Sequence, residues 1–125
     1  MAEKILVVED NEQNRILMRQ ILSPHGYEML EAADGLTGLE MARAHKPDLI
    51  LLDVQMPVMN GFMVIRELRN HPELSRIKAI AVTSFAMKGD REKALQAGFD
   101  EYVTKPIDTR TFPDLVRRVL SYTRP

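Results

Sequence analysis

Hydrophobic and polar positions along this chain alternate between short aliphatic runs and longer segments in which apolar residues recur every three or four positions. Short apolar runs bounded by turn residues predict strands, and the longer repeat predicts amphipathic helices. The predicted strands are residues 4–8, 27–30, 49–53, 77–82 and 101–104, with the weakest pattern in 27–30. The predicted helices are residues 13–22, 34–45, a segment that begins at 61 and ends at His71-Pro72, 88–97 and 112–120.

Single residues mark several of the helix ends. Asp34 suits an N-cap, and Leu36 and Leu39 are expected on one face of the helix that follows it. Pro113 is expected in the first turn of the last helix, where its missing N–H costs least.

The order of these elements indicates the fold class. Five strands alternate with five helices, and three of the strands are continuously apolar, as is typical of a parallel sheet covered on both faces. We therefore expect an α/β fold with a doubly wound five-stranded parallel sheet. No linker, repeat or low-complexity segment interrupts the pattern, so one domain is expected over residues 1–125, with no separate output domain.

Composition excludes several classes of function. The 125 residues carry a formal net charge of −1, which disfavours partners such as nucleic acid or a membrane surface. The chain has no cysteine, hence no disulfide framework and no thiolate metal site. No apolar run approaches the ~20 residues that a membrane helix needs. We expect a cytoplasmic protein.

Residues able to carry chemistry follow the predicted strands, at the sheet edge where α/β proteins bind ligands. Taken singly, acids at a helix start, loop hydroxyls or a surface lysine are all ordinary features. Their occurrence at four strand ends makes a common site the better interpretation. The residues are Glu9, Asp10, Asp53, Thr83, Ser84 and Lys105.

Asp53 is the least ordinary of these residues, because four aliphatic residues in "PDLILLDVQMPVMNG" lead directly into it. A carboxylate near a core is costly unless something pairs with it. Two unit charges ~4 Å apart repel by about 4 kcal/mol at an effective dielectric constant of 20, so three neighbouring acids favour a divalent cation. Mg²⁺ accepts such ligands together with phosphate oxygens. The scattered His25, His45 and His71 argue against zinc or a redox metal and are interpreted as structural or surface residues.

A carboxylate can also act as a nucleophile toward phosphorus. A nearby lysine and hydroxyl would then stabilise the phosphoryl oxygens. The residues therefore predict that Asp53 accepts a phosphoryl group, with its charge offset by a metal ion and by Lys105.

Four segments of the sequence carry a family resemblance. "LVVEDN" (6–11), "LDVQMPVMNG" (52–61), "AVTSFA" (81–86) and "YVTKPI" (102–107) have the order and spacing of the receiver domain of two-component response regulators. The chain resembles this family over essentially its whole length. The resemblance implies the flavodoxin-like (βα)5 arrangement with strand order 2-1-3-4-5.

The resemblance also implies roles for the acidic residues. Asp53 matches the phosphoacceptor, and Glu9, Asp10 and Asp53, with the backbone carbonyl of Gln55, match the ligands of Mg²⁺, for which Mn²⁺ is an expected substitute. Gln55 and Phe85 match positions that tune the lifetime of the phosphoryl group.

The remaining matches concern the conformational response. Thr83 matches the switch hydroxyl that closes on the phosphoryl group, and Tyr102 matches the aromatic residue that swings inward with it. Lys105 matches the lysine that pairs with the phosphoryl group, and its peptide bond with Pro106 is cis in this family. Ser84 departs from the family pattern, in which many members have a small apolar residue.

The segment 85–107 is most similar to stand-alone receivers of the DivK type, although receivers within hybrid sensor kinases share much of it. This resemblance implies a single-domain response regulator that accepts phosphate from a sensor histidine kinase or a histidine phosphotransfer protein. It would signal by phosphorylation-dependent binding of a protein target through the 88–122 face. We expect a monomer, and no turnover enzyme beyond self-phosphorylation and autodephosphorylation at Asp53.

Three alternatives remain. A pseudo-receiver would bind partners regardless of phosphate and would need neither the acids nor Thr83 and Lys105. A flavin carrier on the same fold would need phosphate-binding glycines and hydroxyls after the first strand, where Glu9 and Asp10 stand instead. A phosphatase of the haloacid dehalogenase kind would need a second acid two residues after its nucleophile, where Gln55 stands.

Overall fold

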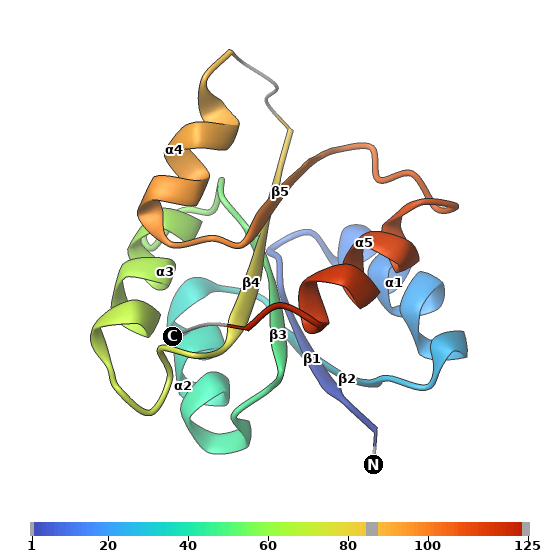
Figure 1. The fold of residues 1–125 in the computed structure, drawn as a ribbon, viewed down its shortest axis with the longest axis horizontal. Coiled ribbons are helices and arrows are strands. Elements are labelled where there is room, and N and C mark those ends of the chain that lie inside the picture. Colours follow the sequence, from blue (N-terminus) through green and yellow to red (C-terminus); the bar gives the residue numbers. More distant parts are fainter. Residues whose placement is uncertain (1, 85–87, 124–125) are drawn as a thin grey trace.

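The computed structural model describes residues 2–84 and 88–123. Five parallel strands form one sheet in the order β2-β1-β3-β4-β5, which confirms the expected strand order (Figure 1). The strands are β1 (Lys4–Val8), β2 (Glu28–Ala32), β3 (Leu49–Asp53), β4 (Lys78–Thr83) and β5 (Glu101–Thr104). The helices are α1 (Glu12–Leu22), α2 (Gly35–His45), α3 (Gly61–Asn70), α4 (Asp90–Ala97) and α5 (Phe112–Leu120), with a 3-10 turn η1 (Ser23–His25) after α1.

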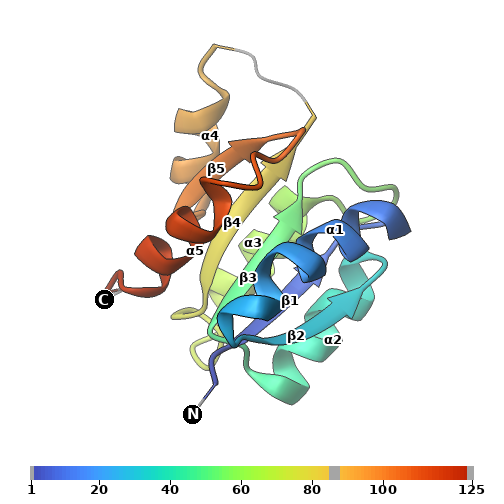
Figure 2. The same ribbon diagram turned by 90° about the vertical axis from the view of Figure 1, so that its right-hand side faces the viewer.

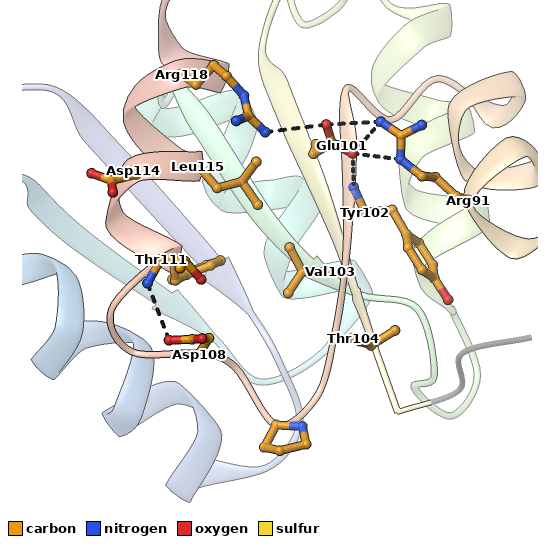
Figure 3. A pocket seen from close by; sticks show the side chains of 12 residues that line it. Arg91, Glu101, Tyr102, Val103, Thr104, Asp108, Thr111, Asp114, Leu115 and Arg118 are labelled. Carbon is orange, nitrogen blue, oxygen red and sulfur yellow. Dashed lines mark hydrogen bonds and ion pairs between the residues drawn. The ribbon is translucent and has the colours of Figure 1, made fainter.

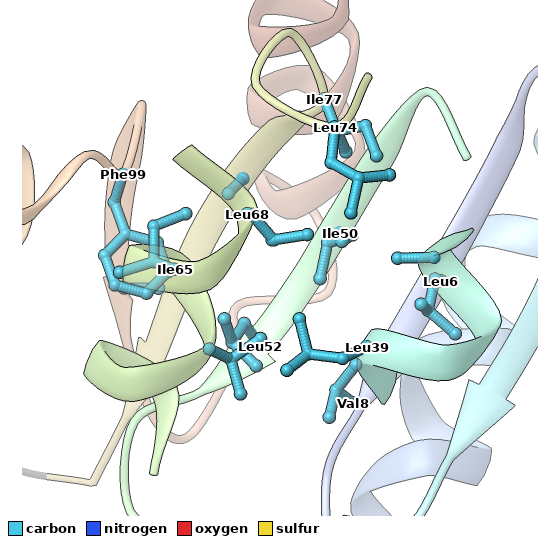
Figure 4. Packing of buried hydrophobic residues seen from close by; sticks show 14 of the residues in the cluster. Leu6, Val8, Leu39, Ile50, Leu52, Ile65, Leu68, Leu74, Ile77 and Phe99 are labelled. Atoms are coloured by element: carbon cyan, nitrogen blue, oxygen red, sulfur yellow. The ribbon is translucent and has the colours of Figure 1, made fainter. Parts of the chain in front are cut away.

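Helices cover both faces of the sheet, which explains why the central strands are continuously apolar. Helices α2, α3 and α4 lie on one face and α1 and α5 on the other (Figures 1 and 2). Because side chains of a strand alternate between faces, Leu6 and Val8 pack under α2, whereas Ile5 and Val7 pack under α1 and α5. The sheet therefore has one hydrophobic core on each face, and Figure 4 shows the core between the sheet and α2, α3 and α4, which contains Leu6 and Val8.

Several element bounds differ from the prediction by one or two residues, and three of these differences have a visible cause or consequence. Strand β2 continues to Ala32, whose carbonyl accepts the Glu9 N–H at 3.0 Å, so pairing with β1 extends the strand beyond its apolar pattern. Strand β4 runs one residue further than predicted and includes Thr83. Helix α4 begins at Asp90 because Gly89, with φ of 89°, takes a left-handed conformation that a helix excludes.

The predicted apolar face of α2 is wrong at Leu36. Asp34 caps this helix as expected, its carboxylate accepting the Thr37 N–H at 2.8 Å. However, the Leu36 side chain is 60% exposed, whereas Leu39 is buried. The buried face centres instead on the small Gly38, where an added Cβ would lie 2.8 Å from a methyl group of Val8. A glycine brings the helix closer to the sheet than a leucine would allow.

The last helix, α5, has the bounds that the sequence predicts. Pro113 lies in the first turn of α5, and Phe112, Val116 and Val119 are buried in the core that α5 shares with α1. Across the two described ranges, no helix has both the length and the apolarity needed to span a bilayer.

Candidate functional site

The residues expected to carry the chemistry lie at the carboxyl edge of the sheet. Glu9 and Asp10 directly follow β1, Asp53 is the last residue of β3, and Thr83 is the last residue of β4. Lys105 directly follows β5. Because parallel strands end at the same edge, residues far apart in the sequence meet there.

Three acids and one lysine come together at this edge. Glu9, Asp10 and Asp53 each offer a carboxylate oxygen, and these oxygens lie within 4.8 Å of one another. The ammonium of Lys105 donates to Glu9 Oε1 at 2.6 Å and lies 3.6 Å from Asp53 Oδ2. Glu9 and Asp53 are 1% and 3% exposed, whereas Asp10 is exposed to solvent. The acid cluster, as we call these three residues, is therefore buried on one side and open at Asp10.

Burial and crowding perturb the acid cluster. Burial, followed by the neighbouring Glu9 carboxyl, raises the pKa of Asp53 from 3.8 to about 7. Burial also acts to raise the pKa of Glu9, but its hydrogen bonds with Asp53 and Lys105 outweigh burial and lower that pKa. The two buried carboxyls thus resist carrying two negative charges at neutral pH, even with Lys105 beside them. A cation at the cluster would relieve this repulsion.

The residue Gln55 connects Asp53 with the loop that follows β4. Its backbone N–H donates to Asp53 Oδ1 at 3.0 Å and fixes the orientation of that carboxylate. Its side-chain oxygen accepts the Ser84 N–H at 3.1 Å. The orientation of Asp53 and the position of the backbone after Thr83 are therefore coupled through one residue. The neighbouring Phe85 lies outside the described residues.

The turn after Asp53 is tightly built. Val58 has φ of 67° and is 99% exposed, which is an unusual conformation for a β-branched residue. Asn60 caps α3 by accepting the Met63 N–H at 3.0 Å. At Gly61, an added Cβ would lie 2.7 Å from the Asp53 carbonyl oxygen, so only glycine lets α3 begin this close to the site.

Thr83 and Tyr102 line one cavity together with Gln55, on the face of the sheet that α3 and α4 cover. Thr83 is buried and Tyr102 is half-buried. Burial, followed by the charge of Asp90, raises the pKa of Tyr102. A cavity of about 230 Å³ separates these two side chains from α3 and α4. It is lined by Val54, Gln55, Phe62, Thr83, Asp90, Lys93 and Tyr102.

The Lys105–Pro106 peptide bond is cis, as the family resemblance implies. The Lys105 N–H donates to the Thr83 carbonyl at 2.7 Å, which continues the pairing of β4 with β5 one residue beyond the strand. The backbone of Lys105 is thereby tied to Thr83 while its side chain reaches Glu9.

Arg15, which lies on α1, is a site residue that the sequence pattern did not predict. Its guanidinium Nη1 donates to the backbone carbonyl of Glu9 at 2.7 Å. A signal was available, because α1 begins just after the acid pair and helical side chains point back toward the helix N-terminus. Arg15 stands one turn after the N-cap Asn11, within reach of the preceding loop.

The donor atoms of the acid cluster fit a hard divalent cation. They are all carboxylate oxygens, the class of ligand that Mg²⁺ prefers over the nitrogen and sulfur donors of zinc sites. Because burial and the neighbouring Glu9 raise the pKa of Asp53, a cation bound here would favour its charged form. Among the residues that the structure describes, no other group of three or more acids and histidines comes this close together.

A doubly wound sheet with an acid cluster, a lysine and a threonine at its carboxyl edge defines a receiver-type signalling domain. Residues 5–117 match the response regulator receiver domain family, and the chain belongs to that family. Polar-differentiation response regulator DivK of Brucella anthropi is 42% identical over 120 residues, which cover 96% of this chain and 98% of that protein.

Solved structures of receiver domains have the same fold. The receiver domain of a sensor histidine kinase from Pseudomonas aeruginosa PAO1 has a TM-score of 0.88 and 34% identity, covers 98% of this chain and 100% of its own, and contains a magnesium ion coordinated in its active-site cleft. Chemotaxis protein CheY4 of Vibrio cholerae has a TM-score of 0.89 and 28% identity, with 95% and 99% covered. Family membership implies a role in two-component signalling, with histidine kinases or phosphotransfer proteins as the general class of partner.

Proposed function

We propose that this protein accepts a phosphoryl group on Asp53 from a phosphohistidine and signals by binding another protein when phosphorylated. The observation that carries the proposal is the position of the Asp53 carboxylate. It is buried, crowded by two further acids within 4.8 Å, and 3.6 Å from the Lys105 ammonium. Two acidic neighbours only destabilise an acid that has a purely structural role. In a phosphoacceptor they can instead hold the cation that neutralises the incoming phosphoryl group.

In the proposed transfer, a carboxylate oxygen of Asp53 attacks the phosphorus of a kinase or phosphotransfer-protein phosphohistidine. The oxygen–phosphorus bond forms as the phosphorus–nitrogen bond breaks, and the imidazole leaves with the electron pair of that bond. Lys105 stands where its ammonium would offset the charge on the phosphoryl oxygens. The Gln55 N–H holds the attacking carboxylate in place through Oδ1. The chemistry is confined to gain and loss of this group at Asp53.

We assign the Mg²⁺ site to the carboxylates of Glu9, Asp10 and Asp53, with the backbone carbonyl of Gln55. The bound ion would neutralise charge on both the acids and the incoming phosphoryl group. The exposed Asp10 leaves one side of the site accessible to solvent and to a donor. The sequence similarity to a receiver domain that contains magnesium in its active-site cleft supports this assignment.

Incorporation of labelled phosphate tests the phosphoacceptor. The protein is incubated with a ³²P-phosphorylated histidine kinase in Mg²⁺, and Asp53→Asn is expected to take up no label. Asp48→Asn is the matched control, because Asp48 stands at the opposite end of β3 and its carboxylate accepts a backbone N–H, from Lys4 at 2.8 Å. The label in the wild-type protein is expected to be released by hydroxylamine, as an acyl phosphate is. Hydroxylamine-labile label in Asp53→Asn would contradict the proposal.

The proposed response to phosphorylation runs from Thr83 to the surface formed by α4, β5 and α5. The hydroxyl of Thr83 would move toward the phosphoryl group, and the cavity of about 230 Å³ gives the Tyr102 ring space to turn inward. Tyr102, on β5, lines both this cavity and the outer surface formed by α4, β5 and α5. Motion of its ring would therefore change the cavity and the outer surface together.

The outer surface contains a cavity of about 730 Å³ along β5 between α4 and α5 (Figure 3). Glu101 joins the elements around it: its carboxylate accepts two hydrogen bonds from Arg91 of α4 at 3.1 and 3.2 Å and lies 3.8 Å from Arg118 of α5. A change in Tyr102, the next residue, would disturb this network. We propose this surface as the site of the protein target.

Binding with and without a phosphoryl mimic tests the output. The affinity of a candidate target is measured for the apo protein and for the protein with Mg²⁺ and beryllofluoride, and an increase is expected. A shift from 1:99 to 99:1 between conformers corresponds to about 5.5 kcal/mol of differential binding, so smaller increases reflect partial switching. Equal affinity in both states would favour a pseudo-receiver and contradict this part of the proposal.

A further inference from the structure

Arg15 of α1 makes a contact that the proposed chemistry does not use directly. Its Nη1 donates to the backbone carbonyl oxygen of Glu9 at 2.7 Å, and its side chain is only 16% exposed. That carbonyl belongs to the peptide group between Glu9 and Asp10, the two acids that follow β1. Arg15 thus holds the plane of the peptide that joins two members of the acid cluster.

The other polar atoms of Glu9 are fixed as well. Its N–H donates to the Ala32 carbonyl at 3.0 Å, Oε2 accepts the Asn11 N–H at 3.1 Å, and Oε1 accepts from Lys105 at 2.6 Å. Arg15 supplies the remaining constraint, on the carbonyl. A side chain from α1 therefore completes a set of contacts that leaves the Glu9–Asp10 segment little freedom.

The charge of Arg15 is already balanced away from the acid cluster. Its Nε lies 3.6 Å from Glu31 Oε1 on β2, and Arg19, one turn further along α1, pairs with the other oxygen of Glu31. The cation that contacts the cluster carboxylates is Lys105. The contribution of Arg15 to the site is therefore orientation of the backbone more than neutralisation of charge.

We infer that Arg15 is a positioning residue for the metal site, acting through the Glu9 carbonyl to hold Glu9 and Asp10 where they can bind one Mg²⁺ ion together. This inference rests on the proposed function, because it assumes that the acid cluster binds Mg²⁺. Arginine suits the task, since its planar fork reaches the carbonyl and Glu31 with different nitrogens. Lysine has one nitrogen and would reach only one of them.

The experiment measures Mg²⁺ affinity directly. Amide chemical shifts of the full chain are followed during an MgCl₂ titration for the wild type, Arg15→Met, Arg15→Lys and Arg19→Met. Loss of an outer-shell contact to a metal ligand typically weakens metal affinity by about 10-fold or more, so we expect about 10-fold for Arg15→Met. Arg15→Lys is expected to recover part of this loss. Arg19→Met is the matched control, because it removes the other partner of Glu31 and is expected to retain wild-type affinity.

A second readout separates positioning from damage to the fold. In phosphate uptake from acetyl phosphate, Arg15→Met is expected to need about 10-fold more Mg²⁺ for half-maximal rate while keeping a rate at saturating Mg²⁺ within about twofold of wild type. Arg15→Lys retains the positive charge and one of the two contacts, to the Glu9 carbonyl or to Glu31, so it carries the test if Arg15→Met fails to fold. A fall in the saturated rate without a shift in Mg²⁺ requirement would overturn the inference.

The outcomes separate the inference from the function on which it rests. If the wild-type protein shows no saturable Mg²⁺ binding, the proposed metal site is wrong. If the wild type binds Mg²⁺ and Arg15→Met binds it equally well, the metal site stands and the role of Arg15 is overturned. If Arg19→Met loses as much affinity as Arg15→Met, the effect comes from α1 or from Glu31 in general, and the inference is again overturned.

Discussion

Replacing Asp53 with asparagine is expected to stabilise the protein, although it removes the residue at the centre of the proposed chemistry. The native fold holds this carboxylate in a buried position beside Glu9, which raises its pKa from 3.8 to about 7. Asparagine has the same shape, cannot ionise, and retains an oxygen to accept the Gln55 N–H. The substitution therefore removes a repulsive charge without leaving a cavity or an unpaired donor.

The sign and size of the effect follow from proton linkage. Because the folded-state pKa is above the unfolded value, the folded state binds this proton more tightly, and the contribution of Asp53 to the stability of the wild type falls as pH rises from about 4 to about 7. A shift of about three units corresponds to about 4 kcal/mol as an upper limit at pH 8. Since the cluster is open to water at Asp10, we expect about 2 kcal/mol at pH 8 and almost no difference near pH 4.

Urea unfolding, followed by far-UV circular dichroism in EDTA at pH 4.5, 6 and 8, measures this difference. Asp48→Asn, which removes an acid outside the cluster, is expected to change the unfolding free energy by less than about 0.5 kcal/mol. Mg²⁺ at one hundred times its dissociation constant would stabilise the wild type by about 2.7 kcal/mol and the Asp53→Asn variant by less. If Asp53→Asn is no more stable than wild type at pH 8, or if its advantage is the same at pH 4.5, the reasoning is wrong.

Three further substitutions test other contacts. Lys105→Met leaves the cluster acids without their cation and is expected to destabilise the protein by about 1–3 kcal/mol in urea unfolding and to slow phosphate uptake. Gly61→Ala places a methyl group 2.7 Å from the Asp53 carbonyl oxygen and is expected to lower the free energy of unfolding by about 1–3 kcal/mol. A melting temperature equal to that of the wild type would contradict this close approach. Arg69→Met removes the ion pair with Asp100, which is 7% exposed and lies 3.3 Å from Arg69, together with the hydrogen bonds that Arg69 donates to three backbone carbonyls, so a loss of about 3 kcal/mol is expected, and a loss below about 1 kcal/mol would show that water compensates.

Several features of the site could be predicted from the sequence because they depend on local order. The aliphatic run that leads into Asp53 predicts a buried strand with an acid at its end, and parallel strands bring their carboxyl ends to one edge. Glu9, Asp10 and Lys105 could therefore be assigned to the same site before any distance was known, and the structure brings these residues together with Asp53.

Other features came from the family resemblance and not from the residues themselves. The cis bond before Pro106 is one, because sequence alone gives an X–Pro bond only about a 5–6% chance of being cis. The strand order is another, since the periodicity of the strands is the same for any order. The structure confirms both.

Local sequence patterns were enough to predict the alternation of strands and helices, the burial of both sheet faces and the set of acids at the sheet edge, because hydrophobic periodicity and turn residues act over a few neighbouring positions. Packing between distant elements sets the rest: Gly38 and not Leu36 faces the sheet, the Gln55 side chain reaches Ser84, and Arg15 holds the Glu9 carbonyl. These contacts depend on how closely separate elements approach one another. That separation is set by the packing of the whole core, which no short stretch of sequence encodes.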